Sequence, residues 1–239
     1  MQYNSMPIAH FPYFDTINYY LCFLLHPSVY FGRIYQAPYP LHIETSMSIT
    51  TKEVNPSLWP AIEKLFGSNG ACGGCWCQAW RFEKGESWAG IKGSVARKRL
   101  RDGIRKGTTL GILAFEAKIP IGWCTFGPRD SFPRLNRART LKCNDSSLVW
   151  SIPCFFVSCN HRGKGVATEM LDHALRVMQR RRVSIAEGYP SKPDKDGSYI
   201  SAFSWTGTRS LFRKAGFTVV GNPNGSKQRV RKELTPHTP

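Results

Sequence analysis

The sequence predicts a mixed α/β fold, in which a mostly antiparallel, splayed central sheet carries helices on both faces. Two apolar runs at residues 109–117 and 119–126 are separated by a short polar step, which predicts a β-hairpin. Residues 149–178 have the pattern of an apolar strand, a basic glycine-bearing turn and an amphipathic helix. A later helix is followed by two strands near Thr218 and Val230. Strands before helices, then a β-α-β unit and an antiparallel pair, indicate a mixed sheet.

Three further elements follow from local patterns: an early helix, a basic loop and one more strand. The helix is expected after a polar start at Met47, with Pro60 in its first turn. Its buried side chains would be Trp59, Ile62, Leu65 and Phe66. Residues 128–144 are basic and lack periodicity, so they are interpreted as a loop. A strand is predicted at residues 183–189, before a loop at residues 190–198 that contains proline and glycine.

The helix within residues 149–178 has one apolar stripe, which is expected to be buried. The stripe consists of Val166, Met170, Leu171, Ala174, Leu175 and Met178. The preceding strand is apolar on both faces, as in a covered central strand. Pro153 interrupts this strand and cannot donate to a sheet ladder, so a bulge or splay is expected there.

The turn between this strand and helix has the composition of a phosphate-binding site. A helix N-terminus leaves several backbone N–H groups unpaired and carries a partial positive charge, which suits a pyrophosphate. Gly163 and Gly165 would let the backbone approach the ligand closely, while Arg162 and Lys164 add positive charge. The alternative is a surface turn with incidental glycines, because short glycine motifs often arise by chance.

The spacing Arg162-x-x-Gly165-x-Ala167 after a strand resembles the acetyl-coenzyme A signature of the GNAT acetyltransferase superfamily. Residues 211–217, LFRKAGF, resemble the late helix of that superfamily. Ser204 or Thr206 is predicted to cap this helix, and Gly216 to end it. The resemblance covers about residues 50–233 and implies the same order of strands and helices, with acetyl-CoA as acyl donor.

The resemblance also implies roles for individual residues. The pantetheine arm of acetyl-CoA would pair with the backbone of the strand, and its pyrophosphate would meet the amides of the turn. The residues predicted to bind acetyl-CoA are Phe155, Val157, Arg162, Gly163, Lys164, Gly165, Val166, Ala167 and Thr168. The splay at Pro153 would leave a backbone N–H free near the thioester oxygen.

Glu187 and Tyr189 are the predicted catalytic residues. Glu187 ends the strand after the helix and is the candidate general base, whereas the alternative is a glutamate salt-bridged to an arginine. Many GNAT enzymes carry a tyrosine in the late helix as acid, but the matching residue here is Phe212, and Trp205 replaces their upstream asparagine. Tyr189 is the substitute candidate; otherwise the thiolate leaves unassisted, since an ordinary thiol pKa is about 8.5.

The cysteine-rich segment CGGCWC at residues 72–77 resembles a metal knuckle or a redox pair. It offers at most three ligands and has no second pair, so no metal is predicted, and the eight cysteines are interpreted as reduced thiols of a cytoplasmic protein. Together with residues 122–124, 126–129 and 187–190, this segment is similar to an uncharacterised bacterial GNAT subgroup, where it would form the acceptor-binding loop.

Composition predicts one domain at residues 47–234, since a chain of 239 residues with 41% hydrophobic content can bury one core. Residues 1–46 contain seven of the nine tyrosines and no lysine, and are expected to be a weakly structured extension from a start codon assigned too early. Their most apolar run, residues 17–31, is too short to span a bilayer and lacks the features of a secretory signal, so no membrane association is predicted. The tail at residues 235–239 is expected to be disordered.

The formal net charge of +17 implies an anionic partner. Residues 92–106 concentrate seven basic side chains against one aspartate. A solvated helix face is favoured over a nucleic-acid surface for this strip. The predicted function is therefore acetyl transfer from acetyl-CoA to a small-molecule or peptide amine. The alternatives are a non-catalytic acetyl-CoA-binding regulatory module and a nucleic-acid or ribosome-associated protein.

Overall fold

The computed structural model describes residues 48–193, 201–221 and 227–234. Both the predicted extension (1–46) and the predicted tail (235–239) lie outside the described residues. The strands are β1 (Ile49–Glu53), β2 (Leu110–Glu116), β3 (Ile119–Pro128), β4 (Val149–Val157), β5 (Ile185–Gly188), β6 (Thr218–Val220) and β7 (Arg229–Glu233). The helices are α1 (Trp59–Phe66), α2 (Trp88–Ile91), α3 (Ser94–Arg105), α4 (Pro133–Arg137), α5 (Val166–Arg180) and α6 (Arg209–Lys214).

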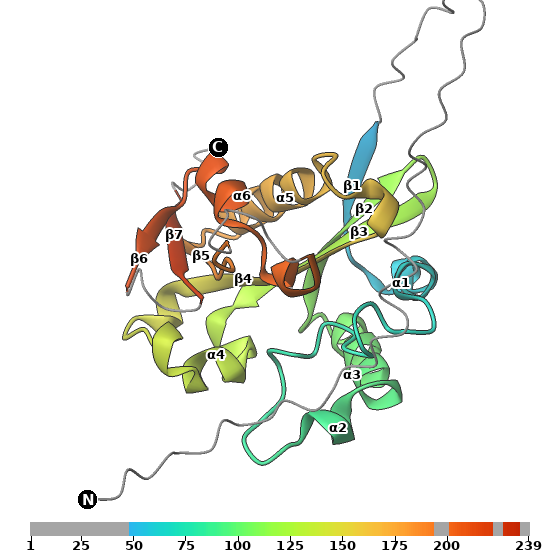
Figure 1. Cartoon of the computed structure of the whole chain (residues 1–239), viewed down its shortest axis with the longest axis horizontal. Coiled ribbons are helices and arrows are strands. Elements are labelled where there is room, and N and C mark those ends of the chain that lie inside the picture. Colours follow the sequence, from blue (N-terminus) through green and yellow to red (C-terminus); the bar gives the residue numbers. More distant parts are fainter. Residues whose placement is uncertain (1–47, 194–200, 222–226, 235–239) are drawn as a thin grey trace, which may run out of the picture. The chain divides into compact units, whose positions relative to one another are not determined.

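The strands form one sheet in the order β1-β2-β3-β4-β5-β7-β6 (Figure 1). Only β4 and β5 are parallel, and all other neighbours are antiparallel. The hairpin prediction is confirmed, because β2 and β3 pair directly and are joined by a two-residue turn in which Ala117 has φ 51°. The predicted mixed, mostly antiparallel sheet is likewise confirmed.

Two apolar cores lie on opposite faces of this sheet, and the strands alternate between them. On β2, Ile112 and Ala114 face the core that contains α5, whereas Leu113 and Phe115 face the core that contains α1 and α3. Figure 1 shows α5 on one side of β1–β4 and α1 and α3 on the other. All six residues of the predicted stripe on α5 are buried.

Pro153 marks a bulge, as its inability to donate predicts. The pairing of β3 with β4 shifts between Thr125, which opposes Cys154, and Gly127, which opposes Ser151. One residue of β3 therefore faces two residues of β4. Side chains of a regular strand face the same core at every second position. Because of the bulge, Ile152 and Phe155 face the same core although they are three positions apart.

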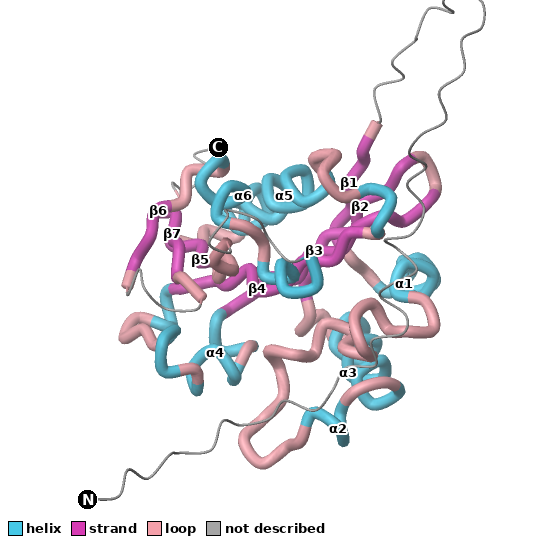
Figure 2. Tube along the Cα trace, viewed as in Figure 1, coloured by secondary structure: helices cyan, strands magenta, loops and turns pink. Residues whose placement is uncertain are grey.

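The sequence pattern missed two features of this fold. Residues 49–53 follow the polar start that the sequence indicates at Met47, yet they form β1, which pairs with β2 from Ile49 opposite Glu116. Residues 128–144 are not a simple loop, because they form α4 and short 3-10 turns (Figure 2) that bury Phe132, Leu135 and Leu141. These turns form a third small core, which encloses Arg129.

The basic strip becomes helix α3, whose apolar face is buried through Ala96, Leu100 and Ile104. Its charged residues point outward, and several form ion pairs, among them Arg99 with Glu86 at 2.5 Å and Lys98 with Asp102 at 2.6 Å. This arrangement is the solvated helix face favoured from the sequence. No described helix is both long enough and apolar enough to span a bilayer.

Candidate active site

The turn between β4 and α5 has the backbone geometry that phosphate binding requires. Gly163 and Gly165 adopt φ values of 73° and 83°, in the left-handed region that favours glycine. Gly165 is the N-cap of α5, and no side chain caps this helix. The amides of Thr168 and Glu169 both donate to the carbonyl oxygen of Gly165, at 2.9 and 3.1 Å. The amides before them precede the first hydrogen-bonded turn, so they are the groups that a phosphate could use.

The side chains around this turn also fit an anionic ligand. Arg162 and Lys164 are exposed, and the α5 end supplies further partial positive charge. Arg162 is held in place because its Nε donates to the carbonyl oxygen of Val157 at 3.1 Å. Gly122 of β3 lets α5 approach the sheet, since a Cβ there would lie 2.8 Å from the Val166 side chain. The end of α5 is therefore fixed directly above the sheet.

Strand β4 loses its partner on one side shortly before this turn. It pairs with β5 only from Val149 to Ile152, so the remainder of β4, from Pro153 onward, has no strand beside it on that side among the described residues. The predicted pairing of Phe155 and Val157 with the pantetheine arm would use this unpaired part. The side chains of both residues face the α5 core, so only their backbone could pair with the arm, and the Val157 carbonyl oxygen accepts from Arg162 Nε.

Glu187 lies at the centre of a buried ion-pair cluster with three arginines. It is fully buried, and Arg129 Nη1 donates to its Oε1 at 2.5 Å. Arg229 Nη2 and Arg231 Nε donate to Oε2 at 2.9 and 2.6 Å. A fully buried carboxylate that accepts from three guanidinium groups is held in its charged form as a structural partner. These contacts support the salt-bridge interpretation of Glu187 and give no support to its role as general base.

Tyr189 belongs to the same cluster. Its hydroxyl accepts a hydrogen bond from Arg129 at 2.6 Å and lies 2.6 Å from Ser151 Oγ. Burial, with a further effect from the Glu187 charge, raises the pKa of Tyr189 well above its ordinary value. A raised pKa makes a phenol a weaker acid, and the ring is fully buried, so this geometry does not favour Tyr189 as the proton donor.

Residues 76–191 match the model of the acetyltransferase (GNAT) family. The chain carries a domain of the GNAT acetyltransferase family. This domain is that of an N-acetyltransferase, and the match spans the turn at the start of α5 as well as Glu187 and Tyr189. No curated protein matches the sequence.

Solved structures with a similar arrangement share little sequence with the GNAT domain. The PaiA N-acetyltransferase of Thermoplasma acidophilum, in complex with coenzyme A, is 16% identical, with a TM-score of 0.47, and the match covers 78% of this chain and 99% of that one. A GNAT-family acetyltransferase of Streptococcus pneumoniae is 11% identical, with a TM-score of 0.49 and coverage of 79% and 100%. The ribosomal-protein-S5-alanine acetyltransferase of Vibrio fischeri is 11% identical, with a TM-score of 0.47 and coverage of 80% and 96%.

The late helix of the GNAT domain is α6, and its cap differs from the one predicted. Thr208, rather than Ser204 or Thr206, accepts the hydrogen bond from the Leu211 amide, because the helix begins only at Arg209. Gly216 has φ 83° just beyond the helix end, as expected. Phe212 is fully buried and packs edge-on against Phe155, with ring centroids 6.0 Å apart. The position of the expected tyrosine is therefore part of the apolar core.

The cysteine-rich segment lies in the long loop between α1 and α2. All seven described cysteines are free thiols, and the described residues contain no group of three or more side chains suited to a metal ion. Burial raises the pKa of Cys75 to about 12 and that of Cys124 well above its ordinary value. The same loop carries Trp80, whose Nε1 donates to the carbonyl oxygen of Pro153 at 3.1 Å. The loop is thereby tied to the bulge of β4.

Several residues of this region carry no sequence signal of their own. Arg129 is fully buried and donates to both Glu187 and Tyr189, although it lies 58 residues from Glu187 in the chain. Arg134 lies over the Trp80 ring, Lys227 over the Trp205 ring, and Arg81 over the Phe132 ring. The only hint in the sequence is the excess of arginine and lysine, which does not say which cations meet.

Replacing Asp145 with asparagine is expected to lower stability at neutral pH and to flatten its acid dependence. Arg231 donates to both oxygens of Asp145, at 2.7 and 2.8 Å, and holds its pKa at about 2 instead of 3.8. Because the folded pKa is depressed, the stabilisation is present above about pH 4 and is lost as the pH falls toward 2. Urea unfolding midpoints across this range test the difference.

The matched control for this measurement is Asp130→Asn. Asp130 accepts an amide hydrogen bond from Asn136 at 3.2 Å, and no described guanidinium group forks onto it. A parallel acid profile for Asp145→Asn and the wild type would contradict the assigned role of Arg231.

Proposed function

We propose that this domain binds acetyl-CoA along β4 and α5 and transfers the acetyl group to an amine by direct attack on the thioester. The observation that carries the proposal is that the backbone of β4 is continuous with the turn at the start of α5. The half of β4 that has no strand beside it on the β5 side, among the described residues, runs straight into the turn with left-handed Gly163 and Gly165 at the start of a 15-residue helix that no side chain caps. An extended pantetheine arm and a pyrophosphate need these two surfaces in this order.

Different predicted binding residues would contact different parts of acetyl-CoA. The amides of residues 163–167, with Arg162 and Lys164, would hold the pyrophosphate, whereas the Thr168 amide already donates to the Gly165 carbonyl oxygen. The backbone of Phe155 and Val157 would pair with the pantetheine arm. The bulge at Pro153 then lies at the thioester end, where a backbone N–H can stabilise the oxyanion of the tetrahedral intermediate.

Proton transfer in this proposal does not pass through Glu187 or Tyr189, which we assign to structural support. The amine attacks in its neutral form, and its proton passes to solvent after the carbon–nitrogen bond forms. The carbon–sulfur bond then breaks, and the coenzyme thiolate leaves. A thiol pKa of about 8.5 makes this departure tolerable without a dedicated acid. The acceptor is an amine of a small molecule or a peptide.

The test is direct quantification of coenzyme A and acetylated product by chromatography, with purified protein, acetyl-CoA and a panel of amines. Reagents that detect thiols are unsuitable, since Cys159 is exposed and would react. The expected result is equal formation of coenzyme A and acetylated amine. Tight acetyl-CoA binding by calorimetry without product for any amine would indicate the non-catalytic regulatory module instead.

Lys164→Glu is a sharp variant for this assay. It reverses a charge at an exposed position and is expected to raise the KM for acetyl-CoA about tenfold, the effect of about 1.4 kcal/mol, with a smaller effect on kcat. Lys64→Glu is the control, because Lys64 is exposed on α1, which packs on the face of the sheet opposite to α5, and the variant makes the same charge change there. Equal effects of the two variants would argue against the proposed pyrophosphate site.

A further inference from the structure

Two half-buried cations lie over two tryptophans beside the bulge of β4, and a third cation follows one of these tryptophans in the chain. Arg134 lies over the Trp80 ring, with its Cζ 5.5 Å from the centroid, and Lys227 Nζ lies 5.1 Å from the centroid of Trp205. The two rings are 5.6 Å apart. Arg81 follows Trp80 in the chain. We call Arg81, Arg134 and Lys227 the cationic cluster.

No carboxylate among the described residues forms an ion pair with the cationic cluster. This contrasts with Arg129, Arg229 and Arg231, which are all paired with Glu187. Buried cations are normally paired, because an uncompensated charge is costly to remove from water. The missing negative charge therefore indicates that a ligand could supply it.

For Arg81, the missing partners can be assigned to individual nitrogen atoms. Its Nη1 donates to the carbonyl oxygen of Ser131 at 3.1 Å, and its guanidinium stacks on Phe132, with Cζ 4.2 Å from the ring centroid. Its Nε and Nη2 are buried and have no hydrogen-bond partner within the described part of the chain. A guanidinium held by one bond and one ring, with two donors left unused, is preorganised for an anion with two oxygens.

Lys227 is held in a comparable way. Its Nζ donates to Thr206 Oγ1 at 3.2 Å and to Ser191 Oγ at 3.4 Å, neither of which carries charge. Burial, followed by the charge of Arg134, lowers the pKa of Lys227 to about 8. A bound anion would reverse this effect, because a nearby negative charge favours the ammonium form.

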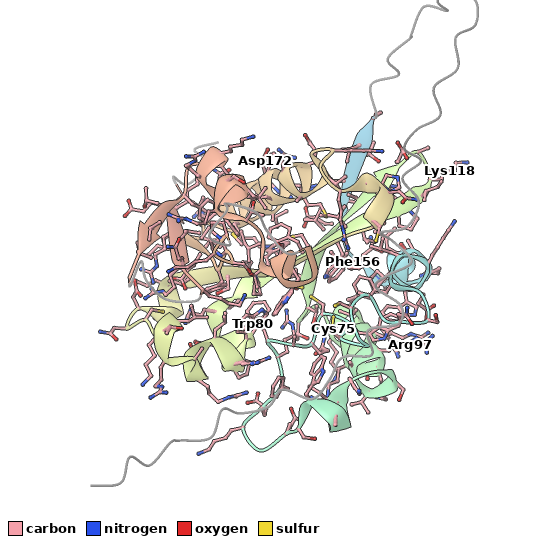
Figure 3. All side chains as sticks on the ribbon, in the orientation of Figure 1. Cys75, Trp80, Arg97, Lys118, Phe156 and Asp172 are labelled. Atoms are coloured by element: carbon pink, nitrogen blue, oxygen red, sulfur yellow. The ribbon has the colours of Figure 1, made fainter. Side chains whose placement is uncertain are left out.

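The cationic cluster lies at the thioester end of the proposed donor site rather than at its phosphate end. Trp80 is bonded to the carbonyl oxygen of Pro153, and Cys154 lies within electrostatic reach of both Arg81 and Lys227. The 3-10 helix Ser201–Thr206, which contributes Trp205 and Thr206, packs against β4. In Figure 3, Trp80 lies near the middle of the molecule, while Arg97 lies at its periphery on α3.

We propose that the cationic cluster, with the Trp80 and Trp205 rings, binds an anionic group, carboxylate or phosphate, carried by the acceptor amine. The inference deepens the proposed function and rests on it. The rings offer an apolar surface to the rest of the acceptor. The same cations would favour the neutral form of the acceptor amine, which is the form that attacks.

The test compares matched amines that differ in one charge. Phenylalanine is compared with phenylalaninamide and phenethylamine, and phosphoethanolamine with ethanolamine. The expected kcat/KM is about 10- to 100-fold higher for the anionic member of a set, the range of a charge-assisted hydrogen bond. The carboxylate and phosphate sets together identify which anion is preferred. Arg81→Met should reduce the ratio to within about threefold of unity without changing the KM for acetyl-CoA.

Arg101→Met is the matched control, since Arg101 lies on α3 near Trp59, where its Cζ is 5.7 Å from the ring centroid. The melting temperature of Arg81→Met without ligand is expected to equal or exceed that of the wild type, because an uncompensated buried charge is removed. A purely structural arginine would give a lower value. Tryptophan fluorescence titrated with each amine, without acetyl-CoA, measures binding independently of turnover.

The outcomes separate the two proposals. Anionic amines that perturb the fluorescence without being acetylated would defeat the proposed function but leave the anion site standing. Acetylation with no preference for the anionic member, or the same ratio in Arg81→Met and Arg101→Met, would overturn the anion site alone. Asp194 and Asp196 lie outside the described residues, so the chain's own carboxylates need a separate test. The double variant Asp194→Asn/Asp196→Asn is made in the wild type and in Arg81→Met. If it lowers the melting temperature of the wild type but not that of Arg81→Met, the chain supplies the anion itself and the inference is wrong.

Discussion

Replacing Gly165 with valine is expected to weaken coenzyme A binding about 100-fold, equivalent to about 2.7 kcal/mol. Gly165 has φ 83°, which is a costly conformation for a β-branched residue. The backbone would relax away from this angle, and the amides at the start of α5 would no longer point at one ligand. Isothermal calorimetry with coenzyme A measures the change without requiring turnover.

The control for this variant is Gly85→Val. Gly85 has φ 92°, and a Cβ there would meet nothing within 4 Å, as is also true of Gly165. The two substitutions therefore introduce comparable backbone strain, but only one alters the helix start. Equal losses of coenzyme A affinity would show that strain, rather than the phosphate-binding turn, causes the effect.

Replacing Glu187 with glutamine is expected to lower the free energy of unfolding by about 3–5 kcal/mol, the usual cost of breaking a buried ion pair. Within the described residues, Glu187 is the one carboxylate that joins Arg129, Arg229 and Arg231, so a neutral amide leaves three guanidinium groups close together with less compensation. Asp145 would still pair with Arg231. Urea denaturation at neutral pH measures the loss.

Glu83→Gln is the matched control, because Glu83 is exposed and its contact with Arg137 is 3.9 Å long. Its effect should stay within about 0.5 kcal/mol. The same Glu187 variant also tests the general-base hypothesis. A Glu187→Gln protein of wild-type stability, with a rate that falls more at neutral than at high pH, would reinstate Glu187 as the base.

The parts of this fold that the sequence predicts are those whose signal is local. The stripe on α5 is visible because its apolar residues repeat within one helix, and all are buried. The bulge follows from Pro153 alone, since a residue without an N–H disturbs any ladder. The left-handed glycines of the turn are likewise visible from composition. In each case the physical cause lies within a few residues of the effect.

The parts that the sequence did not predict depend on distant partners. β1 is polar and becomes a strand only because Ile49–Glu53 can extend the sheet beside β2. Glu187 could not be assigned between base and salt bridge, because Arg129 and Arg231 lie 58 and 44 positions away in the chain. The cationic cluster draws on the α1–α2 loop, α4 and the segment before β7. No window of sequence contains its three members.

The position of β7 has a consequence for how the protein is made. β7 lies between β5 and β6 in the sheet although it follows both in the chain. A ribosome must therefore synthesise residues up to Glu233 before the sheet beyond β4 can close. Until then Glu187 lacks Arg229 and Arg231, and the strands on either side expose open edges. The nascent chain should thus depend on a delayed final step, and a stop codon shortly before β7 should yield an aggregation-prone product rather than a smaller active domain.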